Sequence, residues 1–203
     1  MALPLESATA LVVRQRKELG EIVLGWESRN KYEITDANGS PLGFAAEQGK
    51  GILGTLFRQV LGHWRTFDIH IFDDMRQLAL VAHHPFRFFF QRLEVMDAAG
   101  QLLGCVQQRF AFLRKRFDVL DANGQVIMSM SSPLFKLWTF PFFKGERQVA
   151  VIKKQWGGLL KEAFTDADTF GVELSTELSI TEKTLVAAAA LFVDLLYFEA
   201  KAN

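Results

Sequence analysis

The stretch TLVAAAALFVDLLYF, residues 184–198, is the only long apolar run in this chain, and its environment decides the fold. A bilayer core about 30 Å thick asks for about 20 apolar residues in a helix. Residues 185–198 span only roughly 21 Å as an α-helix at about 1.5 Å per residue. Asp194 stands near the far end, and a charge in hydrocarbon costs roughly 2.5–3.5 kcal/mol. The run therefore favours a helix enclosed by the protein's own core over a membrane span.

Upstream of this run the chain repeats one theme, a strand, an acidic turn and a second strand. The asparagine and glycine of turns such as DANG supply the left-handed positions that a tight hairpin needs. Further alternation of apolar and polar residues predicts a fifth hairpin turning at FKGERQ and a strand near 170–175. Such hairpins predict an antiparallel meander that closes as a barrel or packs as a sandwich. The four clearest examples are KYEITDANGSPLGFAAE (31–47), FDIHIFDDMRQLALVAH (67–83), RLEVMDAAGQLLGCVQQ (92–108) and RFDVLDANGQVIMSM (116–130).

We interpret the chain as a β-barrel with the apolar run threaded through it as a central helix. The four alanines at 187–190 keep that helix slim, so strands can approach it closely. A second stretch, LGTLFRQVLGHW (53–64), has helical spacing and predicts a short helix or an apolar loop. The domain is expected to cover residues 19–203, after a short N-terminal segment at 1–18.

Composition narrows the classes of function. Lysine plus arginine and aspartate plus glutamate number 23 each, so no nucleic-acid partner is expected. No signal peptide is recognisable, which favours a cytoplasmic location. The single cysteine, Cys105, sits in a strand-like stretch and is interpreted as an inert core thiol. No nucleophile, base and orienting group form a recognisable set, so the chain is not expected to be an enzyme.

Four motifs in this order closely resemble the phospholipid scramblase family. The resemblance covers residues 19–199, and the acidic block together with the Asp-bearing tail is its most specific part. It implies a mainly β fold, a tubby-like antiparallel β-barrel of about twelve strands enclosing a hydrophobic C-terminal α-helix. The motifs are NKYEI (30–34), FAAE (44–47), KEAFTDADTFG (161–171) and LFVDLLYFE (191–199). The residues expected along the central helix are Leu185, Leu191, Phe192, Asp194, Leu195 and Phe198.

The same resemblance implies a function at phospholipid membranes. The first hypothesis is calcium-dependent movement of phospholipids between leaflets, by a protein peripheral at the inner face of the plasma membrane. The second is a non-catalytic module that binds lipid headgroups or a protein partner at the membrane surface. Phospholipid membranes are the expected partner in both cases, and protein partners are an additional expectation.

The acidic segment DADTFGVELSTE, residues 166–177, is a weak candidate for calcium binding. Asp166, Asp168 and Glu177 occupy the first, third and twelfth positions of a twelve-residue calcium loop. The fifth and ninth positions, Phe170 and Leu174, offer no side-chain oxygen. The alternative is a turn followed by a half-buried strand. The family's own calcium segment matches this one, so the resemblance strengthens the ligand interpretation.

Two stretches mix phenylalanine and tryptophan with basic residues, HPFRFFFQRLEV (84–95) and SSPLFKLWTFPFFKGE (131–146). Aromatic rings that enter the headgroup boundary while cations meet anionic lipid would make an interfacial membrane contact. The alternative is that both are barrel strands whose rings pack on the central helix and on the segment GILGTLFRQVLG (51–62). The candidate membrane-contact residues are Phe88, Phe89, Phe90, Phe135, Trp138 and Phe140.

Overall fold

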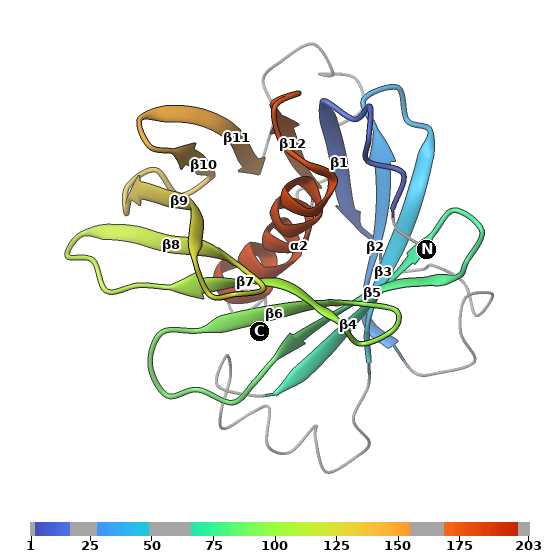
Figure 1. Cartoon of the computed structure of the whole chain (residues 1–203), viewed down its shortest axis with the longest axis horizontal. Helices are drawn as coiled ribbons and strands as arrows, with labels where there is room; N and C mark the ends of the chain where they lie inside the picture. Colours follow the sequence, from blue (N-terminus) through green and yellow to red (C-terminus); the bar gives the residue numbers. More distant parts are fainter. Residues whose placement is uncertain (1–2, 17–27, 49–65, 155–168, 199–203) are drawn as a thin grey trace.

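A computed structural model describes residues 3–16, 28–48, 66–154 and 169–198. Its strands form one closed antiparallel barrel, and helix α2 (Ile180–Tyr197) runs through the middle of it (Figure 1). The order around the barrel follows the chain, with β1 meeting β12 to close it. The tubby-like barrel expected from the sequence is confirmed.

The described residues contain twelve strands. They are β1 (Ala10–Gln15), β2 (Ser28–Asp36), β3 (Pro41–Gln48), β4 (Phe67–Asp73), β5 (Leu78–His84), β6 (Arg92–Asp97), β7 (Leu102–Gln108), β8 (Arg114–Asp121), β9 (Val126–Pro133), β10 (Thr139–Lys144), β11 (Arg147–Lys154) and β12 (Thr169–Leu174).

The acidic hairpin turns share one local structure. In the first, Oδ1 of Asp36 accepts hydrogen bonds of 2.8 Å from the backbone N–H groups of Asn38 and Ser40. Asp97 and Asp121 repeat both of these bonds in their own turns. The backbone N–H of Ser40 is the main cause that lowers the pKa of Asp36. The aspartates are therefore explained by turn formation, as side chains that bond their own backbone.

Helix α2 begins with a capping box. The hydroxyl of Ser179 accepts from the backbone N–H of Glu182, and the Glu182 carboxylate accepts from the backbone N–H of Ser179. Its residues from Lys183 to Leu195 are buried. The helix belongs to the same apolar core as the inward faces of the strands, so the expectation of an enclosed helix is confirmed.

The N-terminal residues are part of the barrel. Strand β1 lies inside residues 1–18 and pairs with both β2 and β12, so the expected separation of a 1–18 segment from the domain is wrong. Strand β1 closes the barrel, because it pairs with β2 on one side and with β12 on the other. The expected helix or loop at 53–64 lies outside the described residues.

Candidate functional site

Connections in the barrel alternate between its two ends, because each strand is antiparallel to the next. The β5–β6, β7–β8 and β9–β10 connections therefore share one end, where α2 also finishes. We call this the aromatic end, because most of the large apolar side chains exposed among the described residues lie on these connections. They are Phe86, Phe88, Phe89, Phe90, Phe110, Phe112, Leu113, Leu134, Phe135, Leu137 and Trp138.

The β5–β6 connection holds its rings outward by hydrogen bonds at its base. Phe88 and Phe89 are 61% and 78% exposed. The carbonyl of Phe90 accepts a 2.8 Å bond from Nε2 of Gln107, and Phe90 has the left-handed backbone angle φ 54°. That conformation costs about 1–2 kcal/mol for a residue with a side chain. A strained residue held by a buried glutamine is the kind of feature found at functional loops.

The β7–β8 connection adds a set of rings that the sequence interpretation missed. Phe110 and Phe112 are 76% and 81% exposed. Leu113 has φ 56°, and its carbonyl accepts a 3.1 Å bond from the N–H of Leu134 on the next connection. The motif RFAFLRKR carries the same mixture of rings and cations as the other two stretches, and could have been recognised by it.

The second aromatic stretch, residues 131–146, contains both exposed and buried rings. Phe135 is 81% exposed, and Trp138 is 43% exposed while stacking on Phe198 of the tail at 5.1 Å. Phe140 is fully buried, so its assignment as a membrane contact is wrong. It lies on β10 with its ring in the apolar core, as the alternative interpretation expected for both stretches.

The three connections carry positive charge only. Residues 85–91, 109–113 and 134–138 include Arg87, Arg109 and Lys136, and no aspartate or glutamate. The acidic hairpin turns lie at the opposite end, on the other set of connections. The two ends of the barrel therefore differ in chemistry. One end exposes apolar rings and cations, and the other exposes the carboxylates of the hairpin turns.

Buried polar groups sit beneath this rim. The ammonium of Lys115 donates to the carbonyls of Lys136 at 2.7 Å and Leu137 at 3.1 Å, and lies 4.0 Å from the centre of the Phe140 ring. Burial lowers the pKa of Lys115 to about 8. Deeper in the barrel, the hydroxyl of Tyr32 donates to the carboxylate of Asp194 at 2.8 Å. These bonds fix the aromatic end to the barrel and to α2.

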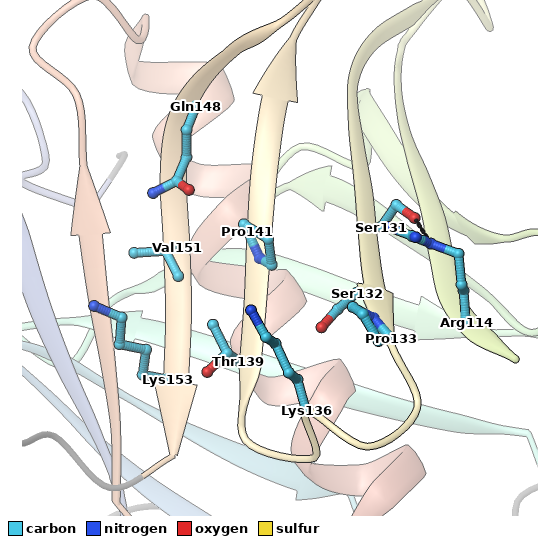
Figure 2. Close-up of a pocket in the computed structure, with 10 residues that line it drawn as sticks. All are labelled: Arg114, Ser131, Ser132, Pro133, Lys136, Thr139, Pro141, Gln148, Val151 and Lys153. Atoms are coloured by element: carbon cyan, nitrogen blue, oxygen red, sulfur yellow. Dashed lines mark hydrogen bonds between the residues drawn. The ribbon is translucent and has the colours of Figure 1, made fainter.

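Beside the aromatic end, a hollow of about 430 Å³ opens on the outer surface of the barrel wall (Figure 2). It spans β8 to β11, with α2 behind these strands. Three cations and three hydroxyl groups contribute to its lining. The lining residues are Arg114, Ser131, Ser132, Pro133, Lys136, Thr139, Pro141, Gln148, Val151 and Lys153.

The calcium segment does not form the expected loop. Its fourth to ninth positions are strand β12, which pairs with β1 and β11, and Phe170 and Leu174 face the core. An extended strand cannot fold its own residues around one ion. Glu177 lies past the end of the strand, and its carboxylate is paired with Arg147. The prediction that Glu177 is the twelfth ligand of a single calcium loop is therefore wrong.

Asp166 and Asp168 lie outside the described residues. Within the described ranges, no three His, Cys, Asp or Glu side chains gather as a metal site would require. Among the same residues, no helix combines the length and hydropathy needed to cross a bilayer. Cys105 is buried and burial raises the pKa of its thiol, as expected of a core cysteine.

Similarity to known proteins agrees with this architecture. The family model described as Scramblase matches residues 2–200. Phospholipid scramblase 1 of Homo sapiens is 28% identical, over 93% of this chain and 63% of that protein. Phospholipid scramblase 1 of Rattus norvegicus is 31% identical, over 95% of this chain and 61% of that protein. The chain thus spans less than two thirds of the length of these relatives.

A solved structure of a protein from Arabidopsis thaliana is also similar. Its TM-score is 0.52 at 12% identity, and the match covers 92% of this chain and 91% of that one. At this identity the likeness concerns the fold alone.

Proposed function

This chain belongs to the scramblase family, and from that premise we propose that it acts at phospholipid membranes, docking by its aromatic end. The observation that carries the proposal is the set of three neighbouring connections whose exposed rings are mixed with cations and contain no carboxylate. Phenylalanine rings enter the boundary between headgroups and acyl chains, and arginine and lysine attract anionic lipid.

Docking by this end fits the rest of the barrel. The rings of Phe89, Phe112 and Phe135 are each more than three quarters exposed, and soluble monomers seldom expose so many large apolar side chains together. The acidic turns at the other end would face away from an anionic surface, which favours one orientation. The inner face of the plasma membrane, which is rich in anionic lipid, is the surface we propose.

The proposal is tested by sedimentation with vesicles of phosphatidylcholine, with and without phosphatidylserine. Burial of one Phe contributes about 1.5–3 kcal/mol, so F89S/F112S/F135S should lower vesicle affinity by at least about tenfold. The matched control is M75S/V126S/I180S, which removes three exposed apolar side chains from the opposite end. Equal binding of both variants would refute docking by the aromatic end.

The finer activity that we propose is the movement of phospholipids between leaflets, responsive to calcium. Support comes from the similarity of this chain to phospholipid scramblase 1 of Homo sapiens and of Rattus norvegicus. Such movement needs a polar path across about 30 Å of hydrocarbon, and α2 fills the barrel. We therefore expect lipid movement to require either release of α2 from the barrel or assembly of several copies.

The filled barrel favours a second candidate, a non-catalytic module that binds lipid headgroups or a protein partner at the surface. Reconstitution into vesicles with labelled lipid separates the two candidates. Calcium-stimulated exchange of the label between leaflets supports the first. Vesicle binding without exchange, at any calcium concentration, supports the second and refutes the first.

A further inference from the structure

A second hollow opens at the end of the barrel opposite the aromatic end, and we call it the mouth pocket. It measures about 630 Å³ and lies between the first turn of α2 and the wall formed by β5, β6 and β7. Small-molecule sites enclose about 300–1,000 Å³ and are mostly apolar, with a few polar groups. Most of the lining here is apolar, and these residues are Ala79, Leu80, Ala98, Ala99, Leu103 and Ile180.

The space in the mouth pocket comes from short side chains beside longer ones. Ala98 and Ala99 are the central residues of the β6–β7 turn, and their methyl groups leave the space above the wall open. Leu80 is 3% exposed and belongs to the apolar core, whereas Ile180 is 37% exposed at the start of α2. An alkyl chain in the pocket would therefore be buried against residues that already belong to the core.

One carboxylate lines the mouth pocket, and only one of its oxygens is used by the turn. Oδ1 of Asp97 accepts from the backbone N–H groups of Ala99 at 2.9 Å and Gln101 at 2.8 Å. Within the described ranges, Oδ2 of Asp97 makes no hydrogen bond or ion pair. The hydroxyl groups of Thr181 and Thr184 line the same pocket. One anionic oxygen and two hydroxyl oxygens match the three N–H donors of a primary ammonium group.

The surrounding charges also favour a cation. Among the described residues, no lysine or arginine lines the mouth pocket. The ammonium of Lys183 is buried and donates to the carbonyls of Leu5 at 3.1 Å and Glu6 at 2.7 Å. The neighbouring β4–β5 turn, residues 73–77, contains two aspartates and one arginine. The pocket thus combines an apolar interior with a net negative rim.

We propose that the mouth pocket binds a single-chain lipid amine, with its alkyl chain against Leu80, Leu103 and Ile180 and its ammonium at Asp97. A protein partner fits less well, because a stable interface takes about 20–30 residues a side and nine described residues line this pocket. One chain and one charge match the whole lining. The inference goes beyond membrane docking, since the pocket lies at the end of the barrel that faces away from the lipid surface in the proposed orientation.

The first test titrates water-soluble single-chain probes into the full chain by isothermal calorimetry at neutral pH. n-Octylamine should bind at least about tenfold more tightly than n-octanol, because its hydrogen bonds are charge-assisted. n-Octanoate should not bind, because its carboxylate would meet that of Asp97. n-Octylamine should also bind about fifteenfold more tightly than n-hexylamine, since each buried CH₂ contributes about fourfold. Absence of octylamine binding, or octanoate binding of equal affinity, would overturn the proposal.

D97N tests the ionic half of the site, because asparagine keeps the turn-forming side-chain oxygen and removes the charge. It should weaken octylamine binding at least about tenfold and leave octanol binding unchanged within about twofold. The matched control is D36N, since Asp36 makes the same two turn bonds on the distant β2–β3 turn and does not line the pocket. D36N should change octylamine affinity less than about twofold, because distant exposed charges are screened.

I180S tests the apolar half of the site and should weaken octylamine and octanol binding by a similar factor. Thermal melts of D97N, D36N and I180S exclude a loss of folding as the cause. Equal loss of octylamine affinity in D97N and D36N, or unchanged affinity of I180S for both probes, would overturn the proposal.

Two further measurements separate this inference from its alternatives. A tripeptide amide of lysine and leucine is the probe for a protein segment, and its binding without octylamine binding would refute a lipid amine. F89S/F112S/F135S should bind octylamine as the wild type does. Octylamine binding by a chain that does not bind vesicles would refute membrane docking and support the amine site. Vesicle binding without octylamine binding would overturn the amine site and leave docking intact.

Discussion

The hydroxyl of Tyr32 on β2 donates a 2.8 Å hydrogen bond to Oδ2 of Asp194 on α2, joining residues 162 positions apart in the sequence. Both side chains are buried, and Nζ of Lys154 lies 4.0 Å from the other carboxylate oxygen. A hydroxyl, a carboxylate and an ammonium in an apolar core satisfy one another there. The carboxylate of Asp194, which argues against a membrane span, thus helps to hold α2 inside the barrel.

Removing this carboxylate should destabilise the fold strongly. D194A removes the buried carboxylate that Tyr32 and Lys154 contact, and breaking a buried charge pair in this way costs about 3–5 kcal/mol. Y32F removes one hydrogen bond to a charged group and should cost about 1.5–3 kcal/mol. Urea unfolding followed by circular dichroism measures both. A cost below about 1 kcal/mol for D194A would contradict a structural role for the buried cluster.

Gly104 on β7 lies between the neighbouring strand β8 and helix α2. A Cβ built at this position would lie 2.3 Å from the backbone carbonyl oxygen of Leu120 and 2.9 Å from Cδ1 of Leu185. G104A should therefore destabilise by about 1–3 kcal/mol through overpacking. Melting and urea curves check this value. A stability equal to the wild type would contradict the close packing of Gly104 against β8 and α2.

The matched control for Gly104 is Gly124 in the β8–β9 turn. It has φ 80° and open space around its Cα. G124A should cost only the backbone strain of a left-handed residue, about 1–2 kcal/mol, with no effect on α2. Near-ultraviolet circular dichroism, which reports on the packed rings, should change for G104A and not for G124A.

Lys115 should make stability depend on pH in a defined window. Its pKa falls from 10.5 to about 8 on folding because the ammonium is desolvated. Between about pH 8 and 10.5 the unfolded chain therefore binds more protons than the folded one, and stability should rise with pH. The rise is measured as the difference between wild type and K115M, since other groups titrate in both. If the free energies of unfolding of wild type and K115M differed by the same amount across this pH range, the lowered pKa of Lys115 would be contradicted.

The calcium prediction now rests on Asp166 and Asp168 alone. If calcium stimulates lipid exchange through this segment, D166A/D168A should abolish the stimulation. E177A should leave it unchanged, because Glu177 lies beyond β12 and is paired with Arg147. The labelled-lipid exchange assay, run with calcium and with a chelator, measures both. Loss of calcium stimulation in E177A would contradict this expectation and would support Glu177 as a calcium ligand.

Local signals in the sequence were sufficient for much of the fold. Turn residues such as those of DANG and DAAG, and alternation on either side, located the hairpins, since these features are decided within a few residues. The length of the apolar tail and Asp194 located the central helix. Strand β1 was missed because six residues carry little periodicity of their own, and its place depends on distant partners β2 and β12.

The candidate site was only partly predictable for a related reason. Phe88, Phe89 and Phe135 were identified by composition, but composition does not tell which face of a strand a ring occupies. Phe140 belongs to β10 and points inward. The hollow was not predicted, because it depends on where the pairing of β9 and β10 stops in three dimensions.

Fluorescence quenching by brominated lipids tests the docking of the aromatic end most directly. Single tryptophans are placed at F89W, F112W or F135W, in a chain whose own four tryptophans are changed to phenylalanine, with M75W as the control at the opposite end. With phosphatidylserine-containing vesicles, docking by the aromatic end predicts a blue shift and strong quenching at the first three positions and neither at the fourth. Quenching at M75W, or none at the three aromatic-end positions, would contradict it.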